Sequence, residues 1–471
     1  MQKTKIIATL GPACEDQDSI YHMLSSGLSM FRINAPHLQN NFTKLQKTVQ
    51  KIRREAKRAD KSVSIMMDLG GPKIRVQLPS DTEKISISAG QKYRVGFKNY
   101  DIPLNTKINI LKINKNATIK IDDGKIIFKF LKKEQDCFVV EAINNGTITN
   151  NKGVNFPGLQ LQLPAVTSKD RKHIQLGIDL GVDWIAQSFV RNATNIYPIQ
   201  RILLKNKSKI PIIAKIETGD AIQNLDSILM KYDGILIARG DLGVETELSK
   251  LPKLQKRIIN NCIYHKKPCI VATQMLESMI QSETPTRAEV NDVANAIYDG
   301  VDAIMLSAET AIGRYPVQAV AMMSAISLNV ESDLDDSNFN RNIFDSLSTS
   351  ITNNYLAICH AAYSIANNLD IKVIVVLTDS GKTAIQMAQF RPNTNIVAIT
   401  PHQKTCNLLS MIWGVVPIHV KQINDINDIY KLVNNILIKK SLIQTGHTFL
   451  ITSGVLKLKN STNMLQIYQS K

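Results

Sequence analysis

The segment PIIAKIE, Pro211 to Glu217, is an apolar run that becomes charged at its C-terminal end, and GILIARGD, Gly234 to Asp241, repeats the pattern. Strands buried on both faces of a parallel sheet have this composition. Six further runs share it: KIIATLG (5–11), MFRIN (30–34), VSIMMDLG (63–70), WIAQSFV (184–190), CIVATQM (269–275) and AIMLSAET (303–310). Eight such units, separated by segments of helical period, predict a (β/α)8 barrel, a fold whose chemistry lies at the C-terminal strand ends.

Four of these strand ends carry polar residues two positions apart. The pairs are Arg32 with Asn34, Lys215 with Glu217, Arg239 with Asp241, and Ser307 with Glu309. Residues i and i+2 of a strand point to the same face, so we expect all four pairs at one mouth of the barrel. Simple solvation of a strand end could explain one pair. A doubly wound open sheet, the alternative fold, does not explain polar groups at nearly every strand end.

The barrel pattern stops after Pro72 and returns at LPAVTSKD, residues 163–170. Between these points lie weaker alternating runs such as YRVGF (93–97) and CFVVEAI (137–143). We therefore expect an α/β protein with a barrel at 1–72 and 164–333 and an inserted β-barrel lid domain at 73–163. The runs VIVVLT, NIVAIT and FLITSG predict a C-terminal α/β domain at 334–471.

The composition narrows the partners and the compartment. There are 57 basic and 40 acidic residues, a formal net charge of +17, but no basic run is interleaved with aromatics. We therefore expect no specific nucleic-acid partner, and a nucleic-acid-binding protein stays the non-enzymatic alternative. Six cysteines without a CxxC pair indicate free thiols. No signal-peptide core and no membrane-spanning run is visible, so we expect a cytoplasmic protein without a membrane partner.

The charged strand ends suggest one kind of chemistry. Glu217 and Asp241 offer hard oxygen ligands for Mg²⁺ or Mn²⁺. Lys215 and Arg32 would neutralise a phosphoryl group, a reaction that depends on positioning and charge more than on covalent chemistry. Backbone amides of Gly240 and Asp241 suit a carboxylate, and Thr273 adds a hydroxyl. A Schiff-base aldolase that uses Lys215 is the alternative enzyme.

The residues also resemble a known family over essentially the whole chain. The chain is similar to pyruvate kinases in DLGGPKIR (68–75), NKGVNFPG (151–158), AKIE (214–217), IARGDLGVE (237–245) and the long segment from Ala272 to Glu309. The resemblance implies Mg²⁺-dependent phosphoryl transfer from phosphoenolpyruvate to ADP, giving pyruvate and ATP, the last step of glycolysis. A fold kept only as a scaffold is the alternative, although the matching metal and lysine positions are present.

The resemblance also implies roles for individual residues. Its implied catalytic residues are Lys215, Arg32, Thr273, Ser307 and Glu309, and its metal ligands are Glu217 and Asp241. Its implied substrate-binding residues are Arg32, Lys215, Gly240, Asp241, Thr273 and Ser188. Its implied nucleotide-binding residues are Asn34, His37, Arg75, Lys152 and the lid residue Asp123. The family's usual homotetramer is implied as well.

The sequence departs from the family where many members bind K⁺. The family patterns Asn-Phe-Ser-His and Asp-Thr-Lys-Gly-Pro-Glu correspond here to NAPH (34–37) and DLGGPK (68–73). Pro36 and Leu69 cannot supply the hydroxyl ligands, and the family's glutamate is Lys73. We expect Lys73 to lie near Asn34 and Asp68 as a built-in cation, so that K⁺ is not required, as in the family's K⁺-independent branch. The alternative is a damaged cation site with Lys73 in solvent.

A loop in the C-terminal part suits a phosphate. Residues 378–384, TDSGKTA, follow a predicted strand, but the first glycine of a nucleotide P-loop would fall on Val376. In the family this loop resembles the anchor of a sugar-phosphate or nucleotide effector, and a helix cap without a ligand is the alternative. The candidate effector-binding residues are Thr378, Ser380, Gly381, Lys382 and Thr383.

Overall fold

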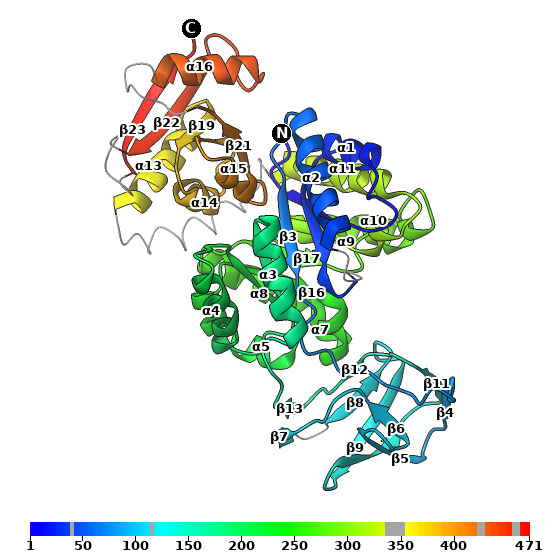
Figure 1. Cartoon of the computed structure of the whole chain (residues 1–471). Helices are drawn as coiled ribbons and strands as arrows, with labels where there is room; N and C mark the ends of the chain where they lie inside the picture. The colour runs from blue at the N-terminus through cyan, green and yellow to red at the C-terminus, as the bar shows by residue number, and fades with distance from the viewer. Residues whose placement is uncertain (38–41, 114–116, 335–353, 422–428, 455–461) are drawn as a thin grey trace. The chain divides into compact units, whose positions relative to one another are not determined.

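The computed structural model describes residues 1–37, 42–113, 117–334, 354–421, 429–454 and 462–471 (Figure 1). The chain divides into two compact units. The first unit contains Met1–Met67, Leu180–Trp184 and Ile259–Lys471. The second unit contains Asp68–Asp179 and Ile185–Ile258. The domain boundaries expected at 72/73, 163/164 and 333/334 stay a prediction.

All eight apolar runs form strands of one closed barrel, in the order β1-β18-β17-β16-β15-β14-β3-β2, which confirms the predicted fold class. The barrel strands are β1 Lys5–Thr9, β2 Leu28–Asn34, β3 Ser64–Asp68, β14 Trp184–Gln187, β15 Ile212–Ile216, β16 Gly234–Ala238, β17 Cys269–Ala272 and β18 Ala303–Leu306. These barrel strands pair in parallel, for example β15 with β16, where Lys215 lies beside Leu236. Every residue of β15 is buried, so its apolar side chains are packed on both faces.

Helices alternate with the barrel strands along the chain, and two of them follow the last strand. They are α1 Gln17–Ser25, α2 Phe42–Arg58, α3 Ser168–Leu180, α4 Tyr197–Lys205, α5 Gly219–Gln223, α6 Leu225–Lys231, α7 Arg239–Glu245, α8 Leu251–Tyr264, α9 Arg287–Tyr298, α10 Ala308–Ala311 and α11 Pro316–Leu334. Local sequence fixes several of their ends. Helix α9 begins with a capping box, in which Thr286 and Glu289 satisfy each other's backbone N–H groups. In α2, Leu45, Val49 and Ile52 recur on one buried face.

The segment inserted between β3 and α3, residues 69–167, contains strands and no helix among its described residues. Over its described residues it has a six-stranded sheet, β12-β8-β9-β10-β5-β6, and the two-stranded sheets β11-β4 and β13-β7. Its strands are β4 Lys84–Ile87, β5 Lys92–Phe97, β6 Ile102–Leu104, β7 Ile110–Ile113, β8 Thr118–Ile121, β9 Ile126–Lys133, β10 Cys137–Ala142, β11 Gly146–Thr149, β12 Val154–Asn155 and β13 Leu159–Leu161. One apolar core that includes Phe128 and Val140 joins the sheets, so the insert folds around its own centre. We call it the lid.

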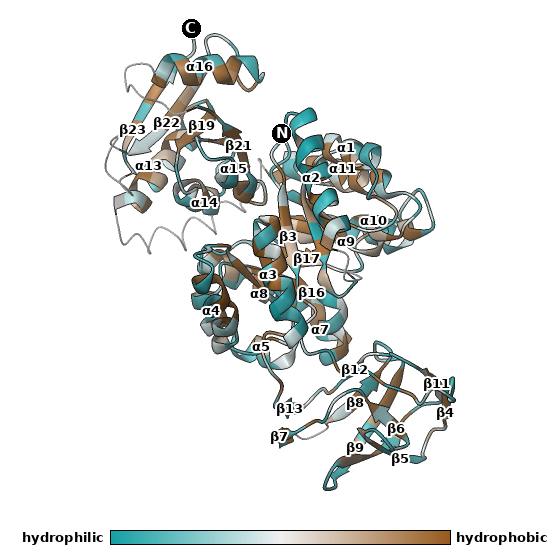
Figure 2. Cartoon of the chain, in the orientation of Figure 1, coloured by the Kyte–Doolittle hydropathy of each residue, from teal (hydrophilic) through white to brown (hydrophobic). Residues whose placement is uncertain are grey.

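The C-terminal part is the predicted α/β domain, with the sheet order β21-β20-β19-β22-β23. Its described elements are α13 Asn354–Asn368, β19 Ile371–Leu377, α14 Lys382–Gln389, β20 Asn395–Thr400, α15 Gln403–Leu409, β21 Val415–His419, α16 Ile429–Lys439, β22 Thr448–Gly454 and β23 Thr462–Gln469. Figure 2 shows β19 mainly in brown, the colour of apolar residues, and four successive residues of this strand, Val373–Val376, are buried. The runs VIVVLT, NIVAIT and FLITSG thus form the strands expected of them.

Candidate active site

Lys215 is the centre of a buried charged cluster in the second unit. It lies on β15 with its side chain 11% exposed, and its Nζ is 3.0 Å from Glu217 Oε1 and 3.2 Å from Asp68 Oδ1. The same ammonium donates to Ser188 Oγ at 2.8 Å. Ser188 in turn donates to the carbonyl of Leu69 at 2.6 Å, which fixes its orientation. Three strand ends of the barrel therefore meet around one ammonium group.

Glu217 is a buried carboxylate, and its surroundings favour a cation close to it. Its side chain is 1% exposed, and Oε2 accepts the backbone N–H of Phe189 at 2.7 Å. Phe189 has φ 54°, a rare conformation for an aromatic residue, and it aims this N–H at the carboxylate. Burial raises the pKa of Glu217, the ammonium of Lys215 opposes that change, and the charge of Asp241 adds to it. A cation bound beside both carboxylates would relieve both unfavourable effects.

Helix α7 carries two further predicted site residues, Gly240 and Asp241. Strand β16 ends at Ala238 and α7 begins directly, so Gly240 and Asp241 lie in its first turn. Asp241 Oδ1 is 3.1 Å from Lys73 Nζ. The same ammonium lies 5.9 Å from the centre of the Phe189 ring. Lys73 thus has a carboxylate partner on α7, a contact for which the sequence offered no signal.

The predicted residues of the first unit form contacts of their own. Arg32 Nη1 donates to Thr9 Oγ1 at 3.0 Å. Glu309, 2% exposed, accepts backbone N–H groups from Ser307 at 2.6 Å and Leu276 at 3.2 Å. Burial raises the pKa of Glu309. Its carboxylate therefore shapes the loop that presents Ser307.

Thr273 shows a backbone feature that sequence reasoning missed. Thr273 and Gln274 both have positive φ, 72° and 54°, directly after β17. Such conformations are rare for non-glycine residues, and for a β-branched residue they are strained. The hydroxyl of Thr273 donates to the carbonyl of Ala272 at 2.6 Å. Strain of this kind, at a strand end of a barrel, is typical of functional sites.

The predicted nucleotide-binding residues are spread over both units. Asn34 is half-buried at the end of β2, and His37 is exposed in the short helix η1, Ala35–His37. In the lid, Arg75 Nη1 donates to the carbonyl of Asn151 at 2.8 Å. The side chain of His37 is accessible to solvent, and that of Arg75 is partly accessible.

The neighbouring lid residues Asp122 and Asp123 differ in their contacts. Lys152 Nζ is 2.9 Å from Asp122 Oδ1, and this hydrogen bond is the main reason why the pKa of Asp122 is lowered. Asp123, the predicted residue, is exposed, and both aspartates have positive φ, 55° and 54°. The sequence IDDG contains both residues, but its spacing does not distinguish the one that pairs with Lys152.

The effector candidates gather at the start of α14. Gly381 caps this helix with φ 82°, and its N–H donates to Thr378 Oγ1 at 3.0 Å. Thr383 Oγ1 lies 2.8 Å from Thr462 Oγ1 on β23. Ser380 and Lys382 are exposed. The loop therefore presents Ser380 and Lys382 at a helix start, and its role as an effector site stays a prediction.

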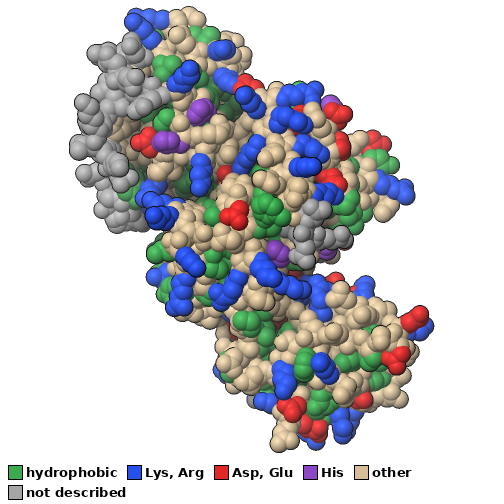
Figure 3. Space-filling view, in the orientation of Figure 1, with side chains coloured by type: hydrophobic (Ala, Val, Ile, Leu, Met, Phe, Trp, Pro, Cys, Tyr) green, Lys and Arg blue, Asp and Glu red, His purple; other side chains and the backbone are tan. Residues whose placement is uncertain are grey.

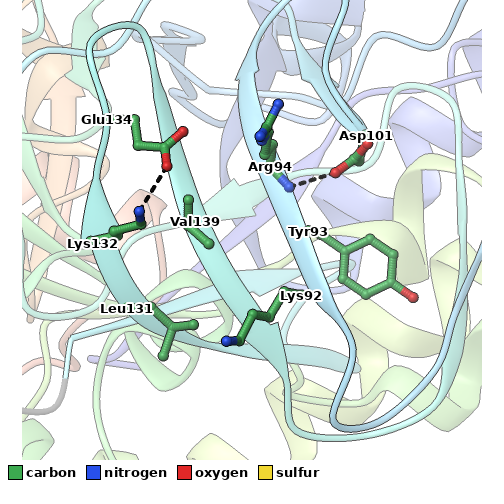
Figure 4. Close-up of a pocket in the computed structure, with 8 residues that line it drawn as sticks. All are labelled: Lys92, Tyr93, Arg94, Asp101, Leu131, Lys132, Glu134 and Val139. Carbon is green, nitrogen blue, oxygen red and sulfur yellow. Dashed lines mark hydrogen bonds and ion pairs between the residues drawn. The ribbon is translucent and has the colours of Figure 1, made fainter.

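A hollow of about 520 Å³ lies elsewhere, on the lid (Figure 4). Its lining residues are Lys92, Tyr93, Arg94, Asp101, Leu131, Lys132, Glu134 and Val139. In Figure 4, Lys132 pairs with Glu134, and the backbone N–H of Arg94 donates to Asp101. None of the predicted site residues lines it, and its charges are already paired in part, so it is a surface hollow of the lid.

Two whole-molecule features bear on partners. Figure 3 shows Lys and Arg side chains scattered over the visible face, with acidic side chains among them. No helix of the described residues is both long and apolar enough to cross a membrane. Within the described part of the chain, no three His, Cys, Asp or Glu side chains form a group able to hold a metal.

Comparison with known proteins decides the family. The model of the pyruvate kinase barrel domain matches residues 1–320, and that of the pyruvate kinase alpha/beta domain matches residues 356–468. The chain belongs to the pyruvate kinase family. Pyruvate kinase 2 of Synechocystis sp. is 37% identical over 99% of this chain and 79% of that protein. The pyruvate kinase of Geobacillus stearothermophilus is 36% identical over 99% of this chain and 80% of that protein.

A solved structure agrees with the sequence relatives. The crystal structure of a pyruvate kinase from Cryptosporidium parvum matches 100% of this chain and 96% of that chain, with a TM-score of 0.94 and 32% identity. The protein is therefore an enzyme of the pyruvate kinase family, a transferase that has the family's barrel fold.

Proposed function

We propose that this pyruvate kinase transfers the phosphoryl group of phosphoenolpyruvate to ADP with Mg²⁺ or Mn²⁺ held by Glu217 and Asp241, and that it works without K⁺. The observation that carries the proposal is the cluster around Lys215, in which one buried ammonium contacts Glu217 and Asp68. The carboxylates of Glu217 and Asp241 suit a hard divalent cation, because two carboxylates together with water and substrate oxygens can complete an octahedron. When bound, the metal supplies charge stabilisation at the phosphoryl oxygens.

The chain's own residues would bind and orient the substrate. Lys215 and Arg32 neutralise the phosphoryl group, and Ser188 holds the Lys215 ammonium in place. Gly240, Asp241 and Thr273 receive the substrate carboxylate. Thr273, with water and the loop of Ser307 and Glu309, moves the proton to the enolate. Asn34, His37, Arg75, Lys152 and Asp123 hold the nucleotide phosphates.

The contacts of Lys215 favour this reaction over the aldolase alternative. A Schiff base needs a free amine, whereas the Lys215 ammonium ion pairs with two carboxylates. We further propose a cytoplasmic homotetramer whose sugar-phosphate or nucleotide effector binds Thr378, Ser380, Gly381, Lys382 and Thr383.

The metal assignment predicts a large change in Mg²⁺ dependence. We expect Glu217→Gln to raise the Mg²⁺ concentration for half-maximal rate by more than about 100-fold, since even outer-shell partners of metal ligands are worth 10–100-fold. The measurement is the initial rate of pyruvate formation across a Mg²⁺ titration. Glu247→Gln is the control, because Glu247 is 69% exposed and pairs with Lys250. An unchanged Mg²⁺ midpoint in Glu217→Gln would remove Glu217 from the metal site.

The K⁺ assignment predicts a switch in ion requirement. We expect equal rates in K⁺ and in tetramethylammonium at equal ionic strength. Lys73→Glu should then make the rate rise about tenfold on adding K⁺, the equivalent of ~1.4 kcal/mol, because the resident ammonium beside Asp241 is lost. Lys129→Glu, an exposed lysine of the same lid, is the matched control. A wild-type enzyme that is inactive without K⁺ contradicts the assignment but leaves the reaction intact.

A further inference from the structure

Helix α7 is held at both of its ends by different parts of the second unit. Its first turn carries Gly240 and Asp241, the proposed substrate and metal residues. At its last turn, Lys120 of lid strand β8 donates to the carbonyl of Val244 at 2.6 Å. Asn155 of lid strand β12 donates to Glu245 Oε1 at 2.9 Å. Only three to five residues, about 5–8 Å of helix, separate these two roles.

The lid is also fastened at its two connections to the barrel, which lead from β3 and to α3. On the outgoing side, the N–H of Gly71 donates to Asp170 Oδ1 at 3.2 Å. On the returning side, Gln187 donates to the carbonyl of Ala165 at 3.1 Å, and Arg191 donates to that of Leu163 at 2.6 Å. These contacts fix the base of the lid. The contacts to Val244 and Glu245 are different, because they join the body of the lid to the helix that carries the site.

We propose that Lys120, Asn155 and Glu245 are positioning residues, which let the lid set the placement of Gly240 and Asp241 through helix α7. The proposal rests on the assignment of Gly240 and Asp241 to substrate and metal. A short helix moves nearly as one body, so loss of a contact at its last turn changes the position of its first turn. Lid contact and substrate affinity are therefore coupled through one element.

The chemistry of the contacts suits such a link. Lys120 places a cation at the C-terminal end of α7, where the helix dipole favours it. The Glu245 carboxylate accepts from Asn155 and from the backbone N–H of Phe156. Burial raises the pKa of Glu245 to about 7, with Lys120 opposing the change and Asp241 adding to it. A desolvated carboxylate with two lid donors is strongly held while the contact exists, and it gains water when the contact breaks.

The decisive experiment separates binding from turnover. We expect Asn155→Ala and Glu245→Ala each to raise KM for phosphoenolpyruvate about tenfold at saturating Mg²⁺, the equivalent of ~1.4 kcal/mol, while kcat changes less than about threefold. Glu245→Gln keeps the acceptor oxygen, and we expect it to retain the parent KM within about twofold. Glu247→Ala, two residues on and exposed, is the matched control for the helix end.

A double variant tests whether the two residues act through one contact. The KM of Asn155→Ala with Glu245→Ala should equal that of Glu245→Ala alone, because the contact can be lost only once. Additive effects, or an unchanged KM in both single variants, would overturn the proposal. If Glu245→Ala does not fold, Lys120→Met with Lys129→Met as control gives the same comparison from the lid side.

A separate readout distinguishes failure of this proposal from failure of the site assignment. Hydrogen exchange of the backbone amides of 239–245, measured without substrate, should be faster in Asn155→Ala than in the parent enzyme. Unchanged exchange would overturn the positioning role. A further outcome is faster exchange in Asn155→Ala while the KM for phosphoenolpyruvate is unchanged both in that variant and in Asp241→Asn. In that case the assignment of Asp241 to the substrate site is wrong.

Discussion

Replacement of Lys215 by methionine is expected to lower kcat by about 10³-fold, within the range measured when a cationic group is removed from a phosphoryl-transfer site. The ammonium of Lys215 contacts Glu217, Asp68 and Ser188. Methionine keeps the apolar stem and the volume but removes the charge. The loss should therefore fall on turnover of bound substrate, measured as pyruvate formation at saturating phosphoenolpyruvate, ADP and Mg²⁺.

The control for Lys215 lies on the same segment. Lys209→Met alters an exposed lysine just before β15, and we expect it to keep the parent kcat. Because Lys215→Met also leaves two buried carboxylates without their partner, circular dichroism and the unfolding midpoint should be recorded for each variant. A correctly folded Lys215→Met enzyme with a kcat within tenfold of the parent would refute the catalytic role.

Asp302→Ala is expected to lower the free energy of unfolding of the first unit by about 3–5 kcal/mol, because it strands a buried charge. Asp302 Oδ1 is 3.0 Å from Arg391 Nη2, and the two side chains are 2% and 3% exposed. Arg391 also donates to the carbonyl of Gly300 at 2.9 Å and lies 4.4 Å from the centre of the Trp413 ring. Burial raises the pKa of Asp302 and lowers that of Arg391, so each residue depends on the other to stay charged.

The measurement is the thermal unfolding midpoint followed by circular dichroism, with Asp370→Ala as the matched control. Asp370 pairs with Lys372 in an exposed ion pair, which should contribute about 0–1 kcal/mol. The double variant Asp302→Leu with Arg391→Met should recover part of the lost stability, because apolar side chains of similar size replace both charges. If Asp302→Ala and Asp370→Ala have the same midpoint, the buried pair contributes no net stability.

Periodic patterns made the fold predictable. PIIAKIE and its seven counterparts are short, apolar and β-branched, and burial on both faces leaves few other places for such runs. The same alternation placed Lys215 and Glu217 on one side at the end of β15, and Lys215 Nζ is 3.0 Å from Glu217 Oε1. These signals are local, since they depend on neighbours along the chain.

The contact partners of the site residues could not be predicted from such local patterns. Lys73 and Asp241 are 168 positions apart, and Asn155 and Glu245 are 90 apart. No local pattern couples such positions, because the path of the whole chain decides which loops meet. The positive φ of Phe189 likewise has no sequence signal, since strained residues contradict local preference.

The place of the lid in the chain has an evolutionary consequence. The lid begins after β3 and ends before α3, so it is inserted in a single strand-to-helix connection of the barrel. Its own apolar core, around Phe128, makes it a self-contained module. Evolution can therefore change the length or the surface charge of this module while the strand order of the barrel stays the same.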